Sequence, residues 1–183
     1  MTTETSQLPQ ETPVKERLSL PEYLRLVKAS FKKHWYYYLA PIVVAVGFNH
    51  YAMIGVNVTD SLKDHLFITI KGNFMPERGD KMAYRWHGGG GYPEGSIFVK
   101  IVRGIPGDTV TREGRDFFVN GSYVGTAKEI SKTGKPLEAG PVGVIPPGHY
   151  YVATTHPDSL DSRYAITGWI KEDAIKGKVF GLF

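Results

Sequence analysis

The hydrophobic and polar positions follow different periods in the two parts of this chain. Before residue 57, apolar residues recur at helical spacing or run together, whereas from Asn57 onward they alternate with polar residues in short segments. Segments such as LFITI, SIFVKIVRGI and DFFVNGSYV, bounded by Gly, Pro and Asp, are typical of strands joined by turns. The pattern predicts a mainly β domain at residues 57–183, folded as an antiparallel β barrel or as packed sheets, after a helical N-terminal part.

Two helical segments of different character are expected before the β domain. Residues 21–34 place Leu24, Val27 and Phe31 at helical spacing among Lys and Arg, which favours a basic juxtamembrane helix on a membrane surface. Residues 35–56 are apolar and aromatic and would reach about 33 Å as a helix, which predicts one transmembrane helix. The uninterrupted apolar part ends at Phe48, so a buried core helix is the alternative.

The N-terminal region also predicts how the chain is oriented in a membrane. Residues 1–20 are rich in Thr, Gln, Pro and Glu, which is typical of a disordered tail. Lys and Arg flank only the N-terminal side of the apolar run, and this fits a cytoplasmic tail under the positive-inside rule. The sequence therefore predicts a single-pass protein of the bacterial inner membrane, with lipid as a partner and the β domain in the periplasm.

The composition excludes several kinds of chemistry. The 183 residues include no Cys, which rules out disulfides, thiolate catalysis and Cys-based metal sites. The six His residues have no metal-ligand spacing, and the glycines at 88–91 lack the Lys-Ser/Thr of a phosphate-binding loop. We therefore expect no metal and no cofactor. Nucleic acid is not an expected partner, because the basic residues directly precede an apolar run. The Gly/Pro-rich residues 128–147 are expected to form a loop or lid.

Lys100 is the first candidate for chemistry. In the segment SIFVKIVRGI, strand alternation places Lys100 on one face with Phe98 and Val102, both apolar. Burial among apolar groups disfavours the ammonium form, so a lysine held in this way can act as a general base near neutral pH. The alternative is a lysine whose amine reaches solvent from a sheet edge.

A polar box near the C-terminus supplies groups that would support such a lysine. The segment DSLDSR contains Ser159, whose hydroxyl is suited to hydrogen-bond the amine, and Asp161 with Arg163, which are suited to form an ion pair that braces the site. The alternative is a polar turn that carries a surface salt bridge of little energetic value.

Together these segments resemble a known family. KIVRGIPGDTV, followed by an Asn-Gly hairpin and by DSLDSRYAITGW, is similar to the two late boxes of the type I signal peptidase family. Those proteins are membrane-anchored serine proteases with a Ser-Lys dyad and a β-rich catalytic domain. The resemblance implies that Lys100 is the general base. One departure is Ala-Ile-Thr after the Asp-Ser-Arg-aromatic element, where the family usually has an early Gly.

The position of the nucleophile follows from a second resemblance. In GNFMPERGD, Asn73 occupies the place of the usual signal-peptidase serine, and an amide does not attack in this chemistry. The segment NVTDSLKDHLF instead resembles the box of the conjugative-transfer, TraF-type branch, with Lys63 and His65 as departures. This resemblance implies that Ser61 is the nucleophile and that the Thr59 hydroxyl supports the oxyanion. Ser159, Asp161 and Arg163 would then support Lys100.

The resemblance implies a membrane-anchored serine endopeptidase that cleaves a secreted or pilin precursor through an acyl-enzyme. Its expected partners are the precursor or propilin substrate, lipid, and the machinery of conjugation or type IV secretion. Two alternatives remain open. A pilin peptidyl cyclase would use the same dyad, and a catalytically dead pilus-assembly module is suggested by Asn73.

Overall fold

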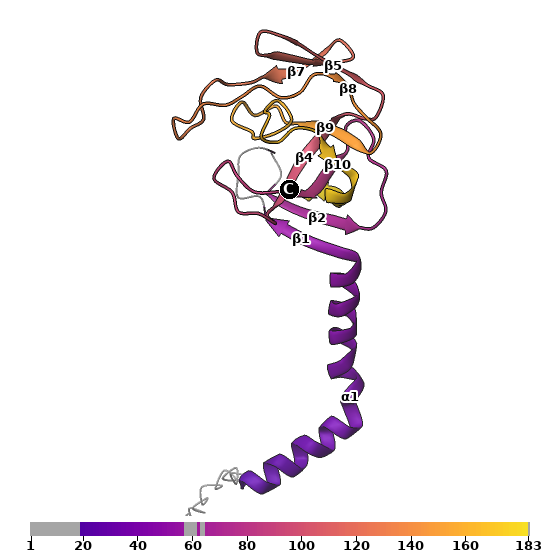
Figure 1. Cartoon of the computed structure of the whole chain (residues 1–183). Helices are drawn as coiled ribbons and strands as arrows, with labels where there is room; N and C mark the ends of the chain where they lie inside the picture. The colour runs from indigo at the N-terminus through magenta and orange to yellow at the C-terminus, as the bar shows by residue number, and fades with distance from the viewer. Residues whose placement is uncertain (1–18, 57–61, 63–64, 183) are drawn as a thin grey trace, which may run out of the picture. The chain divides into compact units, whose positions relative to one another are not determined.

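The computed structural model describes residues 19–56, 62 and 65–182 of the chain (Figure 1). Ser61, Thr59 and nearly all of the expected tail at 1–20 therefore lie outside the described residues. The chain divides into two compact units, Met1–Ala45 and Val46–Phe183, and each is described by itself.

Helix α1, Leu20–Tyr51, begins directly after Ser19, which is bonded to the Glu22 side chain. The Ser19 hydroxyl donates to Oε2 of Glu22 at 2.6 Å, and the Ser19 backbone N–H donates to the same oxygen at 3.1 Å. The second of these bonds is the half of a capping box in which the glutamate side chain reaches back to the backbone N–H before the helix. His34 departs from helical geometry with φ −122° and ψ 22°. The break falls where the sequence pattern changes from basic amphipathic to apolar.

The expected transmembrane helix at 35–56 is corrected by the structure. Among the residues that the structure describes, no helix is long and apolar enough to cross a membrane. The apolar sequence is divided between two elements, because the helix ends at Tyr51 and the next five residues form strand β1, Ala52–Val56. The helical part from residue 35 to 51 reaches only about 26 Å, and it includes four tyrosines, Asn49 and His50.

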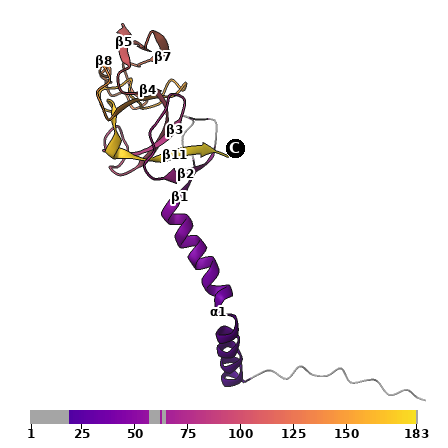
Figure 2. The same cartoon turned by 90° about the vertical axis from the view of Figure 1, so that its right-hand side faces the viewer.

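Seven strands form the larger sheet of the second unit. Every neighbouring pair is antiparallel. The spatial order is β1 (Ala52–Val56), β2 (Leu66–Lys71), β11 (Ile175–Gly181), β3 (Lys81–Arg85), β4 (Ile97–Gly104), β9 (His149–Ala153) and β10 (Ile170–Lys171). A short 3-10 helix, η1 (Glu172–Ala174), leads into β11. Strand β11, the last strand in the sequence, thus lies between β2 and β3, two of the first three strands (Figure 2).

Four strands form a second antiparallel sheet. Its order is β7 (Ser122–Thr126), β6 (Asp116–Val119), β5 (Thr109–Glu113) and β8 (Gly143–Val144). Asn120 and Gly121 connect β6 to β7 with positive φ angles of 49° and 78°. Two successive positive φ angles are what a tight I′ hairpin needs, and Asn-Gly adopts them readily. This sheet lies at the end of the domain opposite β1 and β2 (Figures 1 and 2).

The buried side chains form three clusters, two large and one small. The first joins the smaller sheet to β9 through Val110, Phe117 and Tyr151. The second lies against β3 and β4, and the small third cluster lies beside β2, β3 and β11. The prediction of a mainly β domain made of packed antiparallel sheets is thereby confirmed.

Part of the segment at 128–147, expected to be a loop or lid, packs against the rest of the domain. Leu137 and Ala139 pack on the first cluster. The Gly140 N–H donates to the Arg163 carbonyl at 2.7 Å. A Cβ at Gly140 would lie 2.2 Å from the Ser162 carbonyl oxygen, so only glycine fits this approach. The contact ties the segment to the Asp-Ser-Arg turn.

Candidate active site

Lys100 lies in the middle of β4, opposite Met82 of β3. Its neighbours along the same face are Phe98 and Val102, and only 5% of the residue is exposed. The amine lies 5.6 Å from the centre of the Phe98 ring. Within the described part of the chain, this amine makes no hydrogen bond or ion pair. The sequence alternation thus identified a lysine that is buried among apolar groups.

Burial changes the proton affinity of this lysine. Loss of hydration lowers the pKa of Lys100 from its usual 10.5 to about 8. The Asp161 carboxylate opposes this shift and the Arg163 guanidinium adds to it. Because these two charges partly cancel, desolvation dominates, and a substantial fraction of the amine is neutral at mildly alkaline pH.

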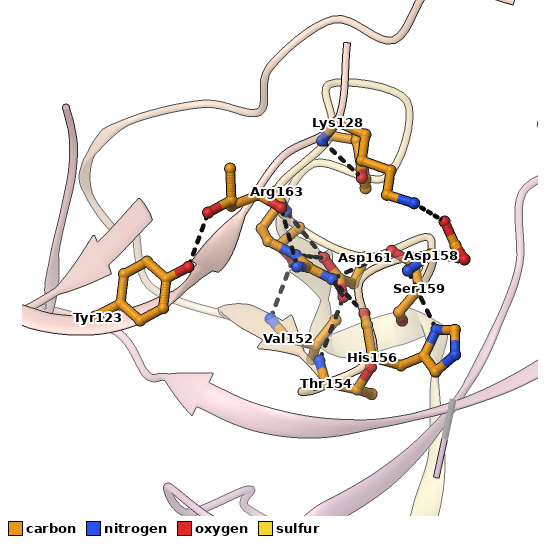
Figure 3. A network of polar contacts seen from close by, with 12 residues as sticks. Tyr123, Lys128, Val152, Thr154, His156, Asp158, Ser159, Asp161 and Arg163 are labelled. Atoms are coloured by element: carbon orange, nitrogen blue, oxygen red, sulfur yellow. Dashed lines mark hydrogen bonds and ion pairs between the residues drawn. The ribbon is translucent and has the colours of Figure 1, made fainter. Parts of the chain in front are cut away.

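Asp161 and Arg163, whose charges act on Lys100, form a buried ion pair with each other, which Figure 3 shows. Arg163 donates from Nε to Oδ1 and from Nη2 to Oδ2 of Asp161, both at 2.8 Å. The carboxylate also accepts from the backbone N–H groups of Thr154 and Arg163 at 3.3 Å. This geometry satisfies both charges in a place that excludes water, which a buried pair requires.

The same guanidinium holds other segments together. Arg163 donates from Nη1 to the Thr126 carbonyl at the end of β7, at 3.1 Å. Its Nη2 donates to the His156 carbonyl at 3.1 Å. Figure 3 shows Arg163 and Asp161 at the centre of this network, with the turn that carries His156, Asp158 and Ser159 to one side. The pair therefore fixes the turn on which Ser159 lies.

Ser159 is 1% exposed, and its hydroxyl has no hydrogen-bond partner among the described residues. The sequence predicted a hydrogen bond from Ser159 to the Lys100 amine, and that bond is not formed in this structure. The Arg163 Nη2 does reach the Ser159 carbonyl at 3.4 Å. The role of Ser159 beside Lys100 stays a prediction.

A groove of about 320 Å³ opens beside Lys100. Its walls come from β1, β2 and β4, and they are mostly apolar, with Val56 and Phe67 on one side. Tyr92 and Asp158 line it from two loops. Asp158 is held by Lys128, and Lys132 approaches it at 3.3 Å. Such a shape suits an extended apolar segment of a substrate whose backbone passes Lys100.

The structure brings together some of the residues expected at the site. The charges of Asp161 and Arg163 both act on the pKa of Lys100. The Ser159 carbonyl accepts a hydrogen bond from Arg163. Ser61 and Thr59 lie outside the described residues. Sequence reasoning missed Tyr92 and Asp158 as groove residues. A weak signal for Tyr92 was an aromatic residue directly after four glycines.

The fold and the site together define a mainly β domain with a buried lysine at the wall of an apolar groove. Residues 30–183 match the family described as signal peptidase, peptidase S26. The chain is 30% identical over 140 residues to signal peptidase I P of Bacillus subtilis subsp. natto. The matched region covers 69% of this chain and 72% of the relative. A crystal structure of a signal peptidase I from Enterococcus faecalis V583 is 25% identical and has a TM-score of 0.40, covering 58% of this chain and 98% of that one.

The chain therefore belongs to the signal peptidase family S26 and is a signal peptidase I-like serine peptidase. The predicted family, enzyme class and precursor-protein substrates are confirmed. Members of the family are typically membrane-anchored. The conjugative branch, the pilin substrate and the individual site residues stay predictions.

Proposed function

We propose that this peptidase cleaves its precursor with Ser61 as nucleophile and Lys100 as general base. The observation that carries the proposal is the buried Lys100 at the wall of the apolar groove. A lysine with a pKa of about 8 is neutral often enough to accept a proton near physiological pH. Lysine acts in this role when burial removes the hydration of its ammonium.

Neighbouring contacts support the choice of Ser61. Val56 and Leu66 are paired across β1 and β2, so these two residues on either side of the segment that contains Ser61 lie side by side. Val56 and Phe67 both line the groove that contains Lys100. Leu62, directly after Ser61, packs on the same small cluster as Val99, directly before Lys100.

In the proposed mechanism, the neutral Lys100 amine takes the proton of the Ser61 hydroxyl as the Ser61 oxygen attacks the scissile carbonyl. The C–N bond then breaks, and the lysine ammonium returns the proton to the leaving amine. Water hydrolyses the acyl-enzyme with Lys100 again as the base. The Ser61 N–H and Thr59 hydroxyl would stabilise the oxyanion, and each such donor typically lowers the barrier by about 3–4 kcal/mol. In this proposal Asp161 and Arg163 keep the turn with Ser159 in place.

The experiment is cleavage of a precursor by Ser61→Ala and Lys100→Ala variants. Both are expected to lose activity by at least about a hundredfold. Ser122→Ala and Lys135→Ala are matched controls, because Ser122 and Lys135 are exposed and lie outside the groove. Normal cleavage by either of the first two variants would exclude the proposed dyad.

The finer proposal concerns the substrate. We infer that it is a pilin precursor processed in conjugative transfer or type IV secretion, at the periplasmic face of the inner membrane. Support comes from the match of NVTDSLKDHLF to the TraF-type box, and from Asn73 in the ordinary serine position. Asn73 also motivates the alternative of a dead assembly module, but the lowered pKa of Lys100 favours an active enzyme.

Mass spectrometry of the matured substrate tests the substrate class and the outcome together. A hydrolase leaves a linear product, whereas a cyclase leaves a product lighter by one water. A mature pilin with a cut at its leader would support the finer proposal. Cleavage confined to ordinary secretory precursors would contradict it and leave the dyad intact.

A further inference from the structure

Tyr84 carries a buried hydroxyl that the mechanism described above does not use. The residue lies in β3, is 1% exposed, and its hydroxyl has no hydrogen-bond partner among the described residues. Native proteins leave few buried polar groups unpaired, and those that remain unpaired are often part of a functional site. Phenylalanine would fill the same space without this penalty.

The sheet register brings Tyr84 next to Lys100. Tyr84 pairs with Phe98 across β3 and β4, and Met82 pairs with Lys100. Directly paired residues share a face, and so do alternate residues of one strand. Tyr84 is therefore the diagonal neighbour of Lys100 on the same face. Diagonal neighbours are within reach of aromatic and long side chains.

Both side chains contact one ring. The Tyr84 and Phe98 rings are 6.0 Å apart in an edge-to-face arrangement, and the Lys100 amine lies 5.6 Å from the centre of the Phe98 ring. Phe98 thus lies beside both the phenol and the amine. Tyr84 itself is not among the residues that line the groove.

Burial, helped by the Asp161 carboxylate, keeps Tyr84 in its neutral form. Burial, and then the Asp161 carboxylate, raise the pKa of Tyr84 well above its usual value. Asp161 and Arg163, in the turn after β9, are the two charged groups that act on the pKa of Lys100. Asp158 lines the groove. A neutral phenol is a good hydrogen-bond donor, and a neutral amine is a good acceptor.

We propose that Tyr84 is a positioning residue, whose hydroxyl donates a hydrogen bond to the neutral Lys100 amine when a substrate fills the groove. The inference rests on the proposed role of Lys100 as the base. Hydrogen bonds of catalytic groups are often long in the free enzyme and shorten in the substrate complex. The bond holds the lone pair of the amine toward the nucleophile and stabilises the unprotonated form.

The test compares Tyr84→Phe with Tyr151→Phe. Tyr151 is also a buried tyrosine, at 0% exposure, and its hydroxyl likewise has no partner among the described residues, but it belongs to the first core cluster, whereas Tyr84 belongs to the second, against which Phe98 packs. Each substitution removes one hydroxyl and no other atom. Both variants are expected to unfold at the wild-type temperature or above, because an unpaired buried hydroxyl favours the unfolded state.

Steady-state kinetics and NMR titration of labelled lysine amines provide the readouts. For Tyr84→Phe we expect kcat to be about tenfold lower, because the hydrogen bond to the Lys100 amine is lost. KM should be unchanged, because Tyr84 does not line the groove. The pKa of Lys100 is expected to move upward by about half to one unit in the presence of a bound, uncleaved substrate peptide. Tyr151→Phe leaves both quantities at the wild-type values.

Three outcomes separate the inference from the proposed function. A lower kcat and a higher Lys100 pKa in Tyr84→Phe alone support it. Equal shifts in both variants, or none in Tyr84→Phe, overturn it, even if Lys100→Ala is inactive. Full activity of Lys100→Ala would overturn the base assignment and the inference with it.

Discussion

Arg163 and Lys100 are both buried cations, 2% and 5% exposed, yet their surroundings differ in nearly every respect. Arg163 has a bidentate carboxylate and two close backbone carbonyls within hydrogen-bond distance. Lys100 has an aromatic ring and no hydrogen bond within the described residues. The paired cation has its pKa raised, and the unpaired one has its pKa lowered to about 8.

The difference separates structural from chemical use of a buried charge. A guanidinium that donates to a carboxylate and to backbone carbonyls holds segments in place and stays charged. An ammonium without acceptors releases its proton more easily, and this is what a general base needs. Both lie close to the same carboxylate of Asp161, so one acidic residue takes part in both environments.

The largest expected effect comes from removing the paired cation. Arg163→Met leaves Asp161 as an unpaired buried carboxylate, so the free energy of unfolding should fall by about 3–5 kcal/mol in urea denaturation. The double variant Asp161→Asn with Arg163→Met is the control, and it should recover part of the loss. A loss below about 1 kcal/mol would mean that the pair is only a packing contact.

Removing the unpaired cation should have the opposite effect on stability. A pKa lowered from 10.5 to about 8 corresponds to about 3 kcal/mol against folding at pH 7, so Lys100→Met should be more stable by up to that amount and inactive. Between about pH 8 and 10.5 the unfolded state binds more protons than the folded state. Wild-type stability therefore rises with pH in that window, and the advantage of the variant shrinks.

Urea denaturation of both proteins at pH 7 and pH 10 checks this sign. An advantage of Lys100→Met that stays constant with pH would argue that the lysine is hydrated in solution. Lys135→Met is the matched control, because Lys135 is exposed.

How well the sequence predicts the surroundings of these two cations depends on how far apart in the chain the contacting residues are. Alternation in β4 predicts that Lys100 has apolar neighbours, and Asn120-Gly121 predicts the hairpin between β6 and β7. Both signals are local in the sequence. The Asp161–Arg163 pair lies within three residues and was expected. Its extensive partners in β7 and the 156–159 turn were not, since they depend on segments far apart in the chain.

The apolar run at 35–56 was the main error. A stretch such as AMIGV fits a helix or a strand, and the pairing that decides between them is with β2, beyond a segment of polar residues. Tyr84 was likewise overlooked, because its hydroxyl becomes notable only when β3 and β4 are in register. Long-range strand pairing is the information that a single-sequence pattern lacks.

A smaller effect is expected in the pH dependence of catalysis. With Lys100 as the base, kcat/KM should rise about tenfold per pH unit below pH 8 and level off above it. Removing the positive charge in an Arg163→Met variant should move the midpoint of this pH profile to higher pH, because Arg163 lowers the pKa of Lys100. An Arg163→Lys variant, which keeps the charge, should leave it near the wild-type value. A profile that is flat from pH 6 to 9 would remove Lys100 from the proton transfer.

The smallest effect is expected for a third cation, Lys178 of β11, which is paired but not buried. Its amine lies 2.6 Å from Oδ1 of Asp80, with 38% of the lysine side chain exposed. Water already solvates the lysine, so Lys178→Met should change the free energy of unfolding by less than about 1 kcal/mol. The effect should shrink further in 1 M salt, where the remaining attraction is screened. A loss as large as that of Arg163→Met would mean that burial is not what separates these cations.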